Sequence, residues 1–150
     1  MKYLIFMIQG QRFAIKLAHV ERVIRAVEVT PIPRGHNMMG LINIQGWITP
    51  VVNSYSLFKL AQREIDINDR FIIIQTEKRQ VALIANEVAE VVEKDWHGVV
   101  DADKFLDRVA LINGVLKLAD GMILIVDPEE LLSATEERLL DEYVNGSMNE

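Results

Sequence analysis

Short apolar runs separated by turn residues recur along the chain, and they predict a protein built mainly of β-hairpins. Near the N-terminus, Tyr3–Ile8 and Gln11–Leu17 flank a two-residue turn that ends in glycine. In the middle of the chain, Phe71–Gln75 and Arg79–Ala85 flank a three-residue turn. Apolar and polar residues that alternate between turn signals are typical of half-buried strands. Each pair of runs is therefore predicted to be a hairpin.

A further hairpin is predicted between Gly40 and Asn53, where Gly40–Ile44 and Trp47–Val52 fold back at Gln45-Gly46. The glycine can adopt the positive φ that a tight turn requires. A two-residue turn would pair Ile44 with Trp47, Asn43 with Ile48 and Ile42 with Thr49. Both faces of this hairpin then carry apolar side chains, so we expect both faces to be covered.

The end of this hairpin carries two local signals. Pro50 cannot donate a hydrogen bond to a sheet, so it is expected on an edge or at a bulge. Asn53 is a good N-cap, and it predicts a helical turn over Ser54–Phe58.

The two halves of the chain resemble each other, which suggests an internal duplication. An ungapped offset of 68 residues matches Tyr3 with Phe71, Phe13 with Val81, Val20 with Val88, Val23 with Val91 and Ile24 with Val92. The hairpin Leu41–Asn53 also resembles Leu116–Asp127, with Gly46 and Gly121 separated by 75 positions. Chance similarity between two β-rich halves is the alternative, because apolar alternation alone produces partial matches.

This pattern predicts one domain over residues 1–150, made of two β-rich subdomains at about 1–60 and 65–132. Strands this short suggest small curled sheets or barrels with a shared core. A C-terminal helix is predicted at about 127–144, with Asp127 as its N-cap. Its expected packing stripe is Leu132, Thr135, Leu139 and Tyr143, and Glu136, Glu137, Asp141 and Glu142 are expected to face water.

Composition narrows the function classes. The 150 residues include no cysteine, which excludes disulfides and thiolate metal sites and fits a reducing cytoplasm. A net charge of −6 with scattered basic residues argues against nucleic acid as a partner. No apolar run approaches the length of a membrane span, so direct membrane insertion is not expected. Half of the residues are hydrophobic, which fits several core layers or an apolar surface for partners.

Candidate chemistry is sparse. The three histidines, His19, His36 and His97, form no metal-binding pair in sequence. A cluster of four acidic residues and one histidine fits a solvated loop better than a cation site. Its members are Glu93, Asp95, His97, Asp101 and Asp103. Ser54 and Ser56 have no base nearby in sequence. We therefore predict no catalytic residue, metal or cofactor, and an enzyme would need His36 or His97 beside a carboxylate in space.

Several segments together resemble the CheW-like coupling domains of bacterial chemosensory systems. The first-half segments are Phe13-Ala14-Ile15, Val20–Ile24, Thr30–Pro33, Gly40–Gly46 and Pro50–Asn53, and the second-half segments are Val81–Val88, Ile112–Gly114 and Asp120-Gly121. The resemblance covers about residues 3 to 132. It implies two five-stranded SH3-like β-barrels that share a hydrophobic interface, in agreement with the duplication.

The resemblance also implies a non-catalytic adaptor. Members of the family bind the regulatory domain of a CheA-type histidine kinase and the cytoplasmic tip of methyl-accepting chemoreceptors, so this chain would be cytoplasmic and recruited to receptor clusters. Val20 and Gly40 match positions where the family contacts receptors, and Gly40 would allow close approach of a partner backbone. Trp47 is either an interface anchor or a core aromatic. The implied partner-binding residues are Val20, Arg22, Gly40, Asn43, Gln45 and Trp47.

Three positions depart from the family pattern. The family commonly has a glutamate at the position of Arg22, an arginine at Gln45 and an aspartate at Asn86. If Arg22 and Gln45 belong to one network, the chain has changed the charge of a partner contact. Two alternatives follow: a CheW-like scaffold in a pathway other than motility, and a small-ligand-binding β-barrel regulator with a closed apolar cavity between its halves.

Overall fold

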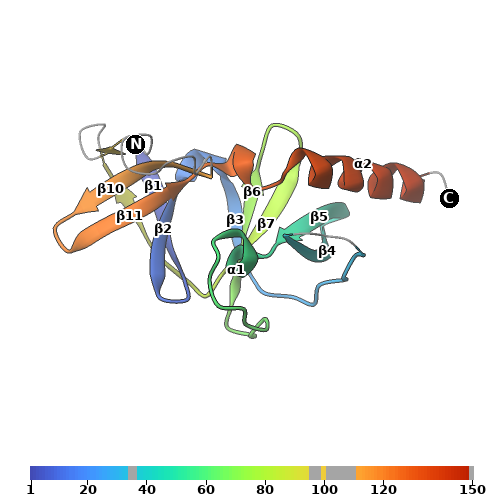
Figure 1. Ribbon diagram of the computed structural model, residues 1–150, viewed down its shortest axis with the longest axis horizontal. Coiled ribbons are helices and arrows are strands. Elements are labelled where there is room, and N and C mark those ends of the chain that lie inside the picture. The colour runs from blue at the N-terminus through green and yellow to red at the C-terminus, as the bar shows by residue number, and fades with distance from the viewer. Residues whose placement is uncertain (34–36, 95–98, 101–110, 149–150) are drawn as a thin grey trace.

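The computed structural model describes residues 1–33, 37–94, 99–100 and 111–148, and it is mainly β (Figure 1). The strands are β1 (Lys2–Ile8), β2 (Gln11–Lys16), β3 (Val20–Arg25), β4 (Met38–Ile44), β5 (Trp47–Val52), β6 (Arg70–Gln75), β7 (Gln80–Ala85), β8 (Glu87–Glu93), β9 (Val99–Val100), β10 (Ile112–Leu118) and β11 (Gly121–Val126). The helical segments are 3-10 turns at Leu17–His19 and Pro128–Glu130, α1 (Ser54–Leu57) and α2 (Ala134–Met148). All four predicted hairpins are present.

The strands form two sheets. Sheet A has the order β8-β1-β2-β11-β10-β9, and sheet B has the order β3-β6-β7-β5-β4. Within each sheet, a hairpin from one half of the chain pairs in parallel with a hairpin from the other half, through β11 with β2 and β5 with β7. The predicted fold class, two small β subdomains with a C-terminal helix, is therefore confirmed.

The two sheets exchange strands between the halves of the chain. After the hairpin β1–β2 the chain crosses over, and β3 pairs with β6 of the second half. After the hairpin β6–β7 it crosses back, and β8 pairs with β1 of the first half. Each sheet therefore combines both halves, and the predicted subdomains at 1–60 and 65–132 do not coincide with the two sheets.

The exchange follows the predicted duplication closely. A bulge lies at Glu21 of β3, and another lies at Ala89 of β8, which is 68 positions later. The late hairpins also correspond, because the bulges precede Gly40 in one and Gly114 in the other. This correspondence has an offset of 74, not the 75 inferred from the glycines. Gly121 is the first residue of β11, and Ala119 and Asp120 form the turn before it.

The hairpin β4–β5 has the register that its two-residue turn predicts, with Ile44 opposite Trp47 and Ile42 opposite Thr49. The Asn53 side chain accepts hydrogen bonds from the backbone N–H groups of Tyr55 and Ser56, so its role as N-cap of α1 is confirmed. Pro50 lies on β5, which is an interior strand of sheet B. At Pro50 itself, however, β5 pairs only with β4, because its pairing with β7 begins one residue later, at Val51.

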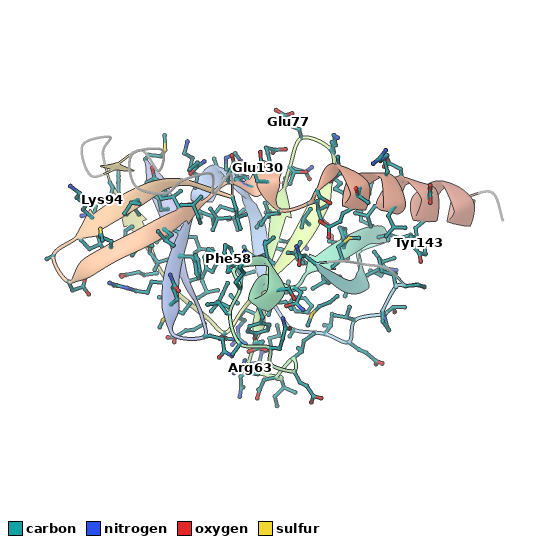
Figure 2. All side chains as sticks on the ribbon, viewed as in Figure 1. Phe58, Arg63, Glu77, Lys94, Glu130 and Tyr143 are labelled. Carbon is teal, nitrogen blue, oxygen red and sulfur yellow. The ribbon has the colours of Figure 1, made fainter. Side chains whose placement is uncertain are left out.

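Both sheets contribute side chains to one large hydrophobic core. The shared cluster includes Phe6 and Phe13 of sheet A and Phe71 and Leu83 of sheet B, all of them buried. Phe58, which follows α1, packs on Phe13 with a ring-centroid distance of 4.4 Å and lies near the centre of the molecule in Figure 2. The space between the sheets is thus filled by packed side chains, as in the predicted shared interface.

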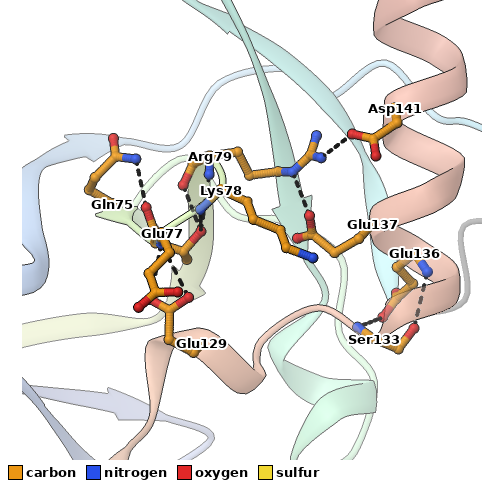
Figure 3. Close-up of polar contacts among 10 residues, drawn as sticks. Gln75, Glu77, Lys78, Arg79, Glu129, Ser133, Glu136, Glu137 and Asp141 are labelled. Atoms are coloured by element: carbon orange, nitrogen blue, oxygen red, sulfur yellow. Dashed lines mark hydrogen bonds and ion pairs between the residues drawn. The ribbon is translucent and has the colours of Figure 1, made fainter.

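The C-terminal helix begins later than predicted. Asp127 caps only the 3-10 turn Pro128–Glu130, and α2 begins at Ala134. Ser133 and Glu136 form a reciprocal capping box: the Glu136 carboxylate accepts from the Ser133 N–H (2.9 Å), and the Ser133 hydroxyl accepts from the Glu136 N–H (3.1 Å) (Figure 3). Glu136 also accepts from the Asn37 N–H at 3.1 Å.

The predicted packing stripe of this helix is therefore wrong in part. Glu136 was expected to face water and is buried, with 2% of its surface exposed, and Leu140 is buried beside it on the helix. Thr135, which was expected to pack, is exposed. The capping box explains why Glu136 lies on the buried face of the helix, because it turns the Glu136 side chain back toward the helix start and toward Asn37.

An arginine on the β6–β7 turn fastens α2 to sheet B. Arg79 Nε donates to Glu137 at 2.9 Å, and Arg79 Nη2 donates to Asp141 at 2.5 Å (Figure 3). The backbone N–H of Glu77 donates to Glu129 in the preceding 3-10 turn. In the described part of the chain, no helix is both long enough and apolar enough to cross a membrane.

Candidate protein-interaction surface

The six predicted partner-binding residues lie on two separate parts of sheet B: the edge strand β3, and the hairpin formed by the other edge strand β4 and its neighbour β5. Val20 and Arg22 belong to β3, and the other four belong to the hairpin β4–β5 and its turn. In the hydrogen-bonded order, β6, β7 and β5 separate β3 from β4. Within the described residues, no ion pair or hydrogen bond joins Arg22 to Gln45, so the structure gives no support to a single network of these two residues.

The tip of the hairpin β4–β5 is a rigid turn. Gln45 and Gly46 both have positive φ, 50° and 91°, as the hairpin turn with two left-handed residues requires. The Asn43 side chain accepts a hydrogen bond from the Gly46 N–H at 2.7 Å, which ties the turn to β4. Asn43 therefore stabilises the conformation that presents its neighbours to solvent.

Two large apolar residues are exposed directly after this turn. Trp47 is 72% exposed and Ile48 is 46% exposed. Because consecutive residues of a strand point to opposite faces, the tip is uncovered on both faces, and the expected cover is absent there. The interpretation of Trp47 as a core aromatic is wrong. A large exposed aromatic on a rigid turn is typical of an interaction anchor.

On the other edge, β3 combines core and surface residues. Val20 is half-buried and packs against the shared core, whereas Arg22 is exposed. The bulge at Glu21 lies between them. A bulge changes the direction of the neighbouring side chains, so the bulge at Glu21 affects the direction in which the Arg22 side chain points.

Gly40 is buried, and the atoms nearest to it belong to residues 29 and 30 of the same chain. A Cβ added at Gly40 would lie 2.0 Å from the carbonyl oxygen of Thr30 and 2.8 Å from Val29 Cγ1. Thr30 and Leu41 exchange two backbone hydrogen bonds of 2.9 and 2.8 Å, which hold this segment against β4. The prediction that Gly40 admits a partner backbone is therefore corrected: it admits residues 29–30 of the same chain.

Several exposed apolar residues besides Ile48 were not predicted from the sequence, and three of them lie on strands. Val23 on β3 and Val91 on β8 are 38% and 48% exposed, and Met122 is exposed at the tip of β10–β11. The signal for two of them was present, since the offset of 68 pairs Val23 with Val91. Met122 corresponds to Ile48 at the structural offset of 74, so the duplication places an apolar residue at both tips.

A partly buried polar cluster surrounds Asn86, one of the three positions that depart from the pattern implied by the resemblance. The Asn86 amide donates to Tyr55 OH at 2.8 Å and to Asp69 Oδ1 at 3.2 Å, and its oxygen accepts from the Gln9 N–H at 2.6 Å. Arg63 also pairs with the buried Asp69. Desolvation lowers the pKa of Arg63, but its interactions with Asp69 and Tyr55 outweigh this and raise the pKa above its usual value. The cluster joins both sheets to the connector between the halves.

In the described part of the chain, no group of three or more histidine, cysteine, aspartate or glutamate side chains is placed to hold a metal ion. His36, Asp95, His97, Asp101 and Asp103 lie outside the described residues. Ser54 is buried, and its hydroxyl donates to the Ile84 carbonyl oxygen at 2.5 Å, which gives it a structural role.

Comparisons with known proteins agree with this architecture. The model of the CheW-like domain family matches residues 2–136. The chain is 25% identical to "Chemotaxis protein CheW" of Klebsiella aerogenes over 143 residues, covering 93% of this chain and 86% of that protein. It is also 25% identical to "Chemotaxis protein CheW" of Bacillus subtilis, covering 87% of this chain and 86% of that protein.

A solved structure is similar over nearly the whole chain. The crystal structure of the scaffolding protein TtCheW from Thermoanaerobacter tengcongensis matches with a TM-score of 0.82 and 25% identity. The match covers 90% of this chain and 94% of that chain. The similarity therefore extends over both sheets.

Proposed function

The chain belongs to the CheW-like domain family, and on that premise we propose that it is a non-catalytic adaptor that couples chemoreceptors to a CheA-type histidine kinase. The names of its relatives, chemotaxis proteins and a scaffolding protein, support an adaptor role in chemosensory signalling. The proposed partners are the regulatory domain of the kinase and the cytoplasmic tip of methyl-accepting receptors. The chain would act in the cytoplasm at receptor clusters, in control of motility or of another output.

The observation that carries this proposal is the exposure of Trp47 at the tip of β4–β5. Because 72% of the surface of Trp47 is exposed, its side chain adds little to the hydrophobic core, and its large apolar area is available to a partner. The positive-φ turn and the Asn43–Gly46 hydrogen bond hold it in place before binding. A preorganised anchor loses little conformational entropy on binding, which favours affinity.

We assign the two edges of sheet B to the two partners. The hairpin tip, with Asn43, Gln45 and Trp47, is proposed to contact the kinase regulatory domain. The β3 edge, with Val20 and Arg22, is proposed to contact the receptor tip. Gly40 acts indirectly, because it sets the fit between β4 and residues 29–30.

Substitution of Trp47 tests the proposal directly. Binding of the Trp47→Ala variant to the kinase regulatory domain encoded in the same genome would be measured by isothermal titration calorimetry. Interface tryptophans are often hot spots, so we expect affinity to fall by about tenfold or more. Ile67→Ala is the matched control, since Ile67 is also highly exposed, at 84%, but lies in the connector before β6. Equal affinity of both variants and the natural chain would contradict the assignment.

The departures at Arg22 and Gln45 allow a second test. The double variant Arg22→Glu, Gln45→Arg restores the residues that the family commonly has. We expect it to bind a kinase regulatory domain from a standard family system more tightly than the natural chain does, because an arginine can pair bidentately with a carboxylate. Unchanged affinity would show that Gln45 lies outside the kinase interface, since Arg22 is already assigned to the receptor edge.

A further inference from the structure

Two arginines face each other across strands β3 and β6. Arg25 lies directly opposite Arg70. The Ala26 N–H donates to the Asp69 carbonyl oxygen at 3.0 Å, so the adjacent pair of arginines is a non-hydrogen-bonded pair, in which side chains lie closest. Like charges directly opposite each other destabilise a sheet. Among the residues that the structure describes, neither arginine takes part in an ion pair. The fold therefore keeps an unfavourable pair of charges here.

An exposed valine lies on the same side of the chain as Arg25. Ile24 and Ala26 pack against the shared core. Arg25 and Val27 alternate with these two residues, so they leave the extended chain on the opposite side. Val27 is 47% exposed. This side of the chain therefore presents a charged residue and, two positions later, an apolar one.

A short turn next to this side presents Ile67, which is 84% exposed. The Asp69 N–H donates to the Asp66 carbonyl oxygen at 2.9 Å, and the Asn68 N–H donates to the Asp66 carboxylate at 2.8 Å. Asp69 is buried and pairs with Arg63, which is labelled in Figure 2. The turn is thus anchored in the protein, and Ile67 is held in place before any partner binds, which lowers the entropy cost of binding.

Arg70 connects the pair of arginines to this turn. Its Nη1 donates to the carbonyl oxygens of Asn68 at 2.7 Å and Asp69 at 3.2 Å, so the guanidinium lies beside the turn that carries Ile67. A guanidinium has five N–H donors on three nitrogens, and these two bonds use only Nη1. Nε and Nη2 can therefore donate to an acceptor from another molecule.

We propose that these residues bind an extended acidic segment of another protein. A carboxylate of the segment lies between the two arginines, accepts charge-assisted hydrogen bonds and removes their repulsion. An apolar residue two positions along the segment matches the spacing of the arginine and the valine on β3 and beyond it, and it contacts the valine and the isoleucine. The exposed Glu28 next to the valine repels a second acid at that position. We call this site the β3–β6 surface, and it consists of Arg25, Val27, Ile67 and Arg70.

Fluorescence anisotropy with a labelled peptide tests the β3–β6 surface. The peptide repeats the sequence Glu-Ser-Leu-Ser, so glutamate and leucine alternate on one face of its extended chain. We expect saturable binding to the natural chain, which weakens as salt is added. A peptide with lysine in place of glutamate, and a peptide with serine in place of leucine, should each bind at least about tenfold more weakly. The inference goes beyond the proposed adaptor function and does not depend on it.

Arg25→Glu is the decisive variant. It should weaken binding of the glutamate peptide by about tenfold or more. Because it replaces two like charges with an ion pair to Arg70, it should also raise the urea concentration at the midpoint of unfolding. Ile67→Ser should weaken peptide binding as well. Arg22→Glu is the matched control, since it makes the same charge change on β3 but lies three positions away and leaves the strand on the other side. It should leave peptide affinity almost unchanged at physiological salt.

Four results would overturn the proposal. One is a glutamate peptide that shows no saturable binding. Another is equal binding of the lysine peptide or of the serine peptide, because the surface would then select neither acidic nor apolar residues. Equal losses for Arg25→Glu and Arg22→Glu would show that net charge determines binding. A lower urea midpoint for Arg25→Glu would show that Arg25 stabilises the fold.

Discussion

At the level of single residues, Gly40 is a position where the fold leaves no room for a side chain. At Gly40, a Cβ would lie 2.0 Å from the Thr30 carbonyl oxygen, which two backbone hydrogen bonds hold in place. The neighbour is backbone and cannot rotate away, so Gly40→Ala must displace residues 29–30 or β4. We expect a loss of about 3 kcal/mol in the free energy of unfolding, measured by urea denaturation.

Gly46→Ala is the control for this prediction. Gly46 also has positive φ, but no atom lies within 4 Å of its added Cβ. Its cost should be limited to backbone strain, about 1 kcal/mol. An equal loss for both variants would show that strain, and not the contact with Thr30, determines the requirement for glycine at Gly40.

At Asn86, the structure shows what the side-chain amide contributes. The Asn86 amide donates to the buried Asp69 carboxylate, so Asn86→Asp would place two carboxylates within about 3 Å of each other. The pKa of the introduced carboxyl would be raised in the folded state relative to the unfolded state. The folded state then binds more protons, so stability falls as pH rises through this range. We expect a loss of about 1–3 kcal/mol at neutral pH and a smaller loss at acidic pH.

The exchange variant Asp69→Asn, Asn86→Asp tests the cause of this loss. It keeps one carboxylate and one amide in the cluster, so it should recover part of the stability at neutral pH. Urea denaturation at several pH values would measure both variants. If the exchange variant is no more stable than Asn86→Asp, repulsion between carboxylates is not the cause.

The role of a residue could be predicted from the sequence where that role depends on residues close to it in the chain. The turn at Gln45-Gly46 and the cap at Asn53 depend on residues within a few positions, and both are confirmed. The exposure of Trp47 was not predictable, because both faces of its hairpin are apolar and either could be buried. The role of Gly40 depends on Thr30, which reaches it only through the path of the chain after β3.

Among the elements, α2 depends most on a few polar contacts. The Glu136 carboxylate accepts from the N–H groups of Ser133 and Asn37, and it is almost completely buried. Glu136→Ala leaves both donors without this acceptor, so we expect a loss of about 1–3 kcal/mol in unfolding free energy and reduced helix content by circular dichroism. Glu142→Ala, an exposed change on the same helix, should cost less than about 0.5 kcal/mol. Equal effects would contradict the capping role.

The hairpins were predicted well because alternation and turn residues are local signals. The start of the C-terminal helix was not, because Asp127 and Pro128 form a good N-terminal signal that the structure uses for a 3-10 turn. The second signal, Ser133 followed three residues later by Glu136, marks the start of α2 and could have been found in the sequence.

At the scale of the whole molecule, the exchange of β3 and β8 makes the two sheets mutually dependent. Fragment 1–62 lacks β6 and β7, which form the centre of sheet B, and fragment 63–150 lacks β1 and β2 of sheet A. We expect neither fragment to fold alone. An equimolar mixture should recover the β-sheet circular dichroism of the intact chain. Cooperative unfolding of either fragment by itself would contradict this dependence.

This exchange explains why the two sheets do not follow the predicted subdomain boundaries, although the repeat is visible in the equivalent bulges. The offset of 68 identifies equivalent residues, but it does not tell whether a third strand pairs within its own half or with the other. That choice depends on contacts between residues far apart in the sequence. The shared core was predictable from the abundance of apolar runs, whereas its division between sheets was not.

Co-sedimentation can determine whether the chain links a kinase to a receptor, as proposed. Membranes that contain a methyl-accepting receptor would be mixed with the CheA-type kinase from the same genome, with and without this chain, and the kinase in the pellet would be measured. We expect the chain to increase the pelleted kinase several-fold and Trp47→Ala to remove most of the increase, since a lost hot spot weakens binding by about tenfold or more. An equal amount of kinase in the pellet with and without the chain would contradict the adaptor function.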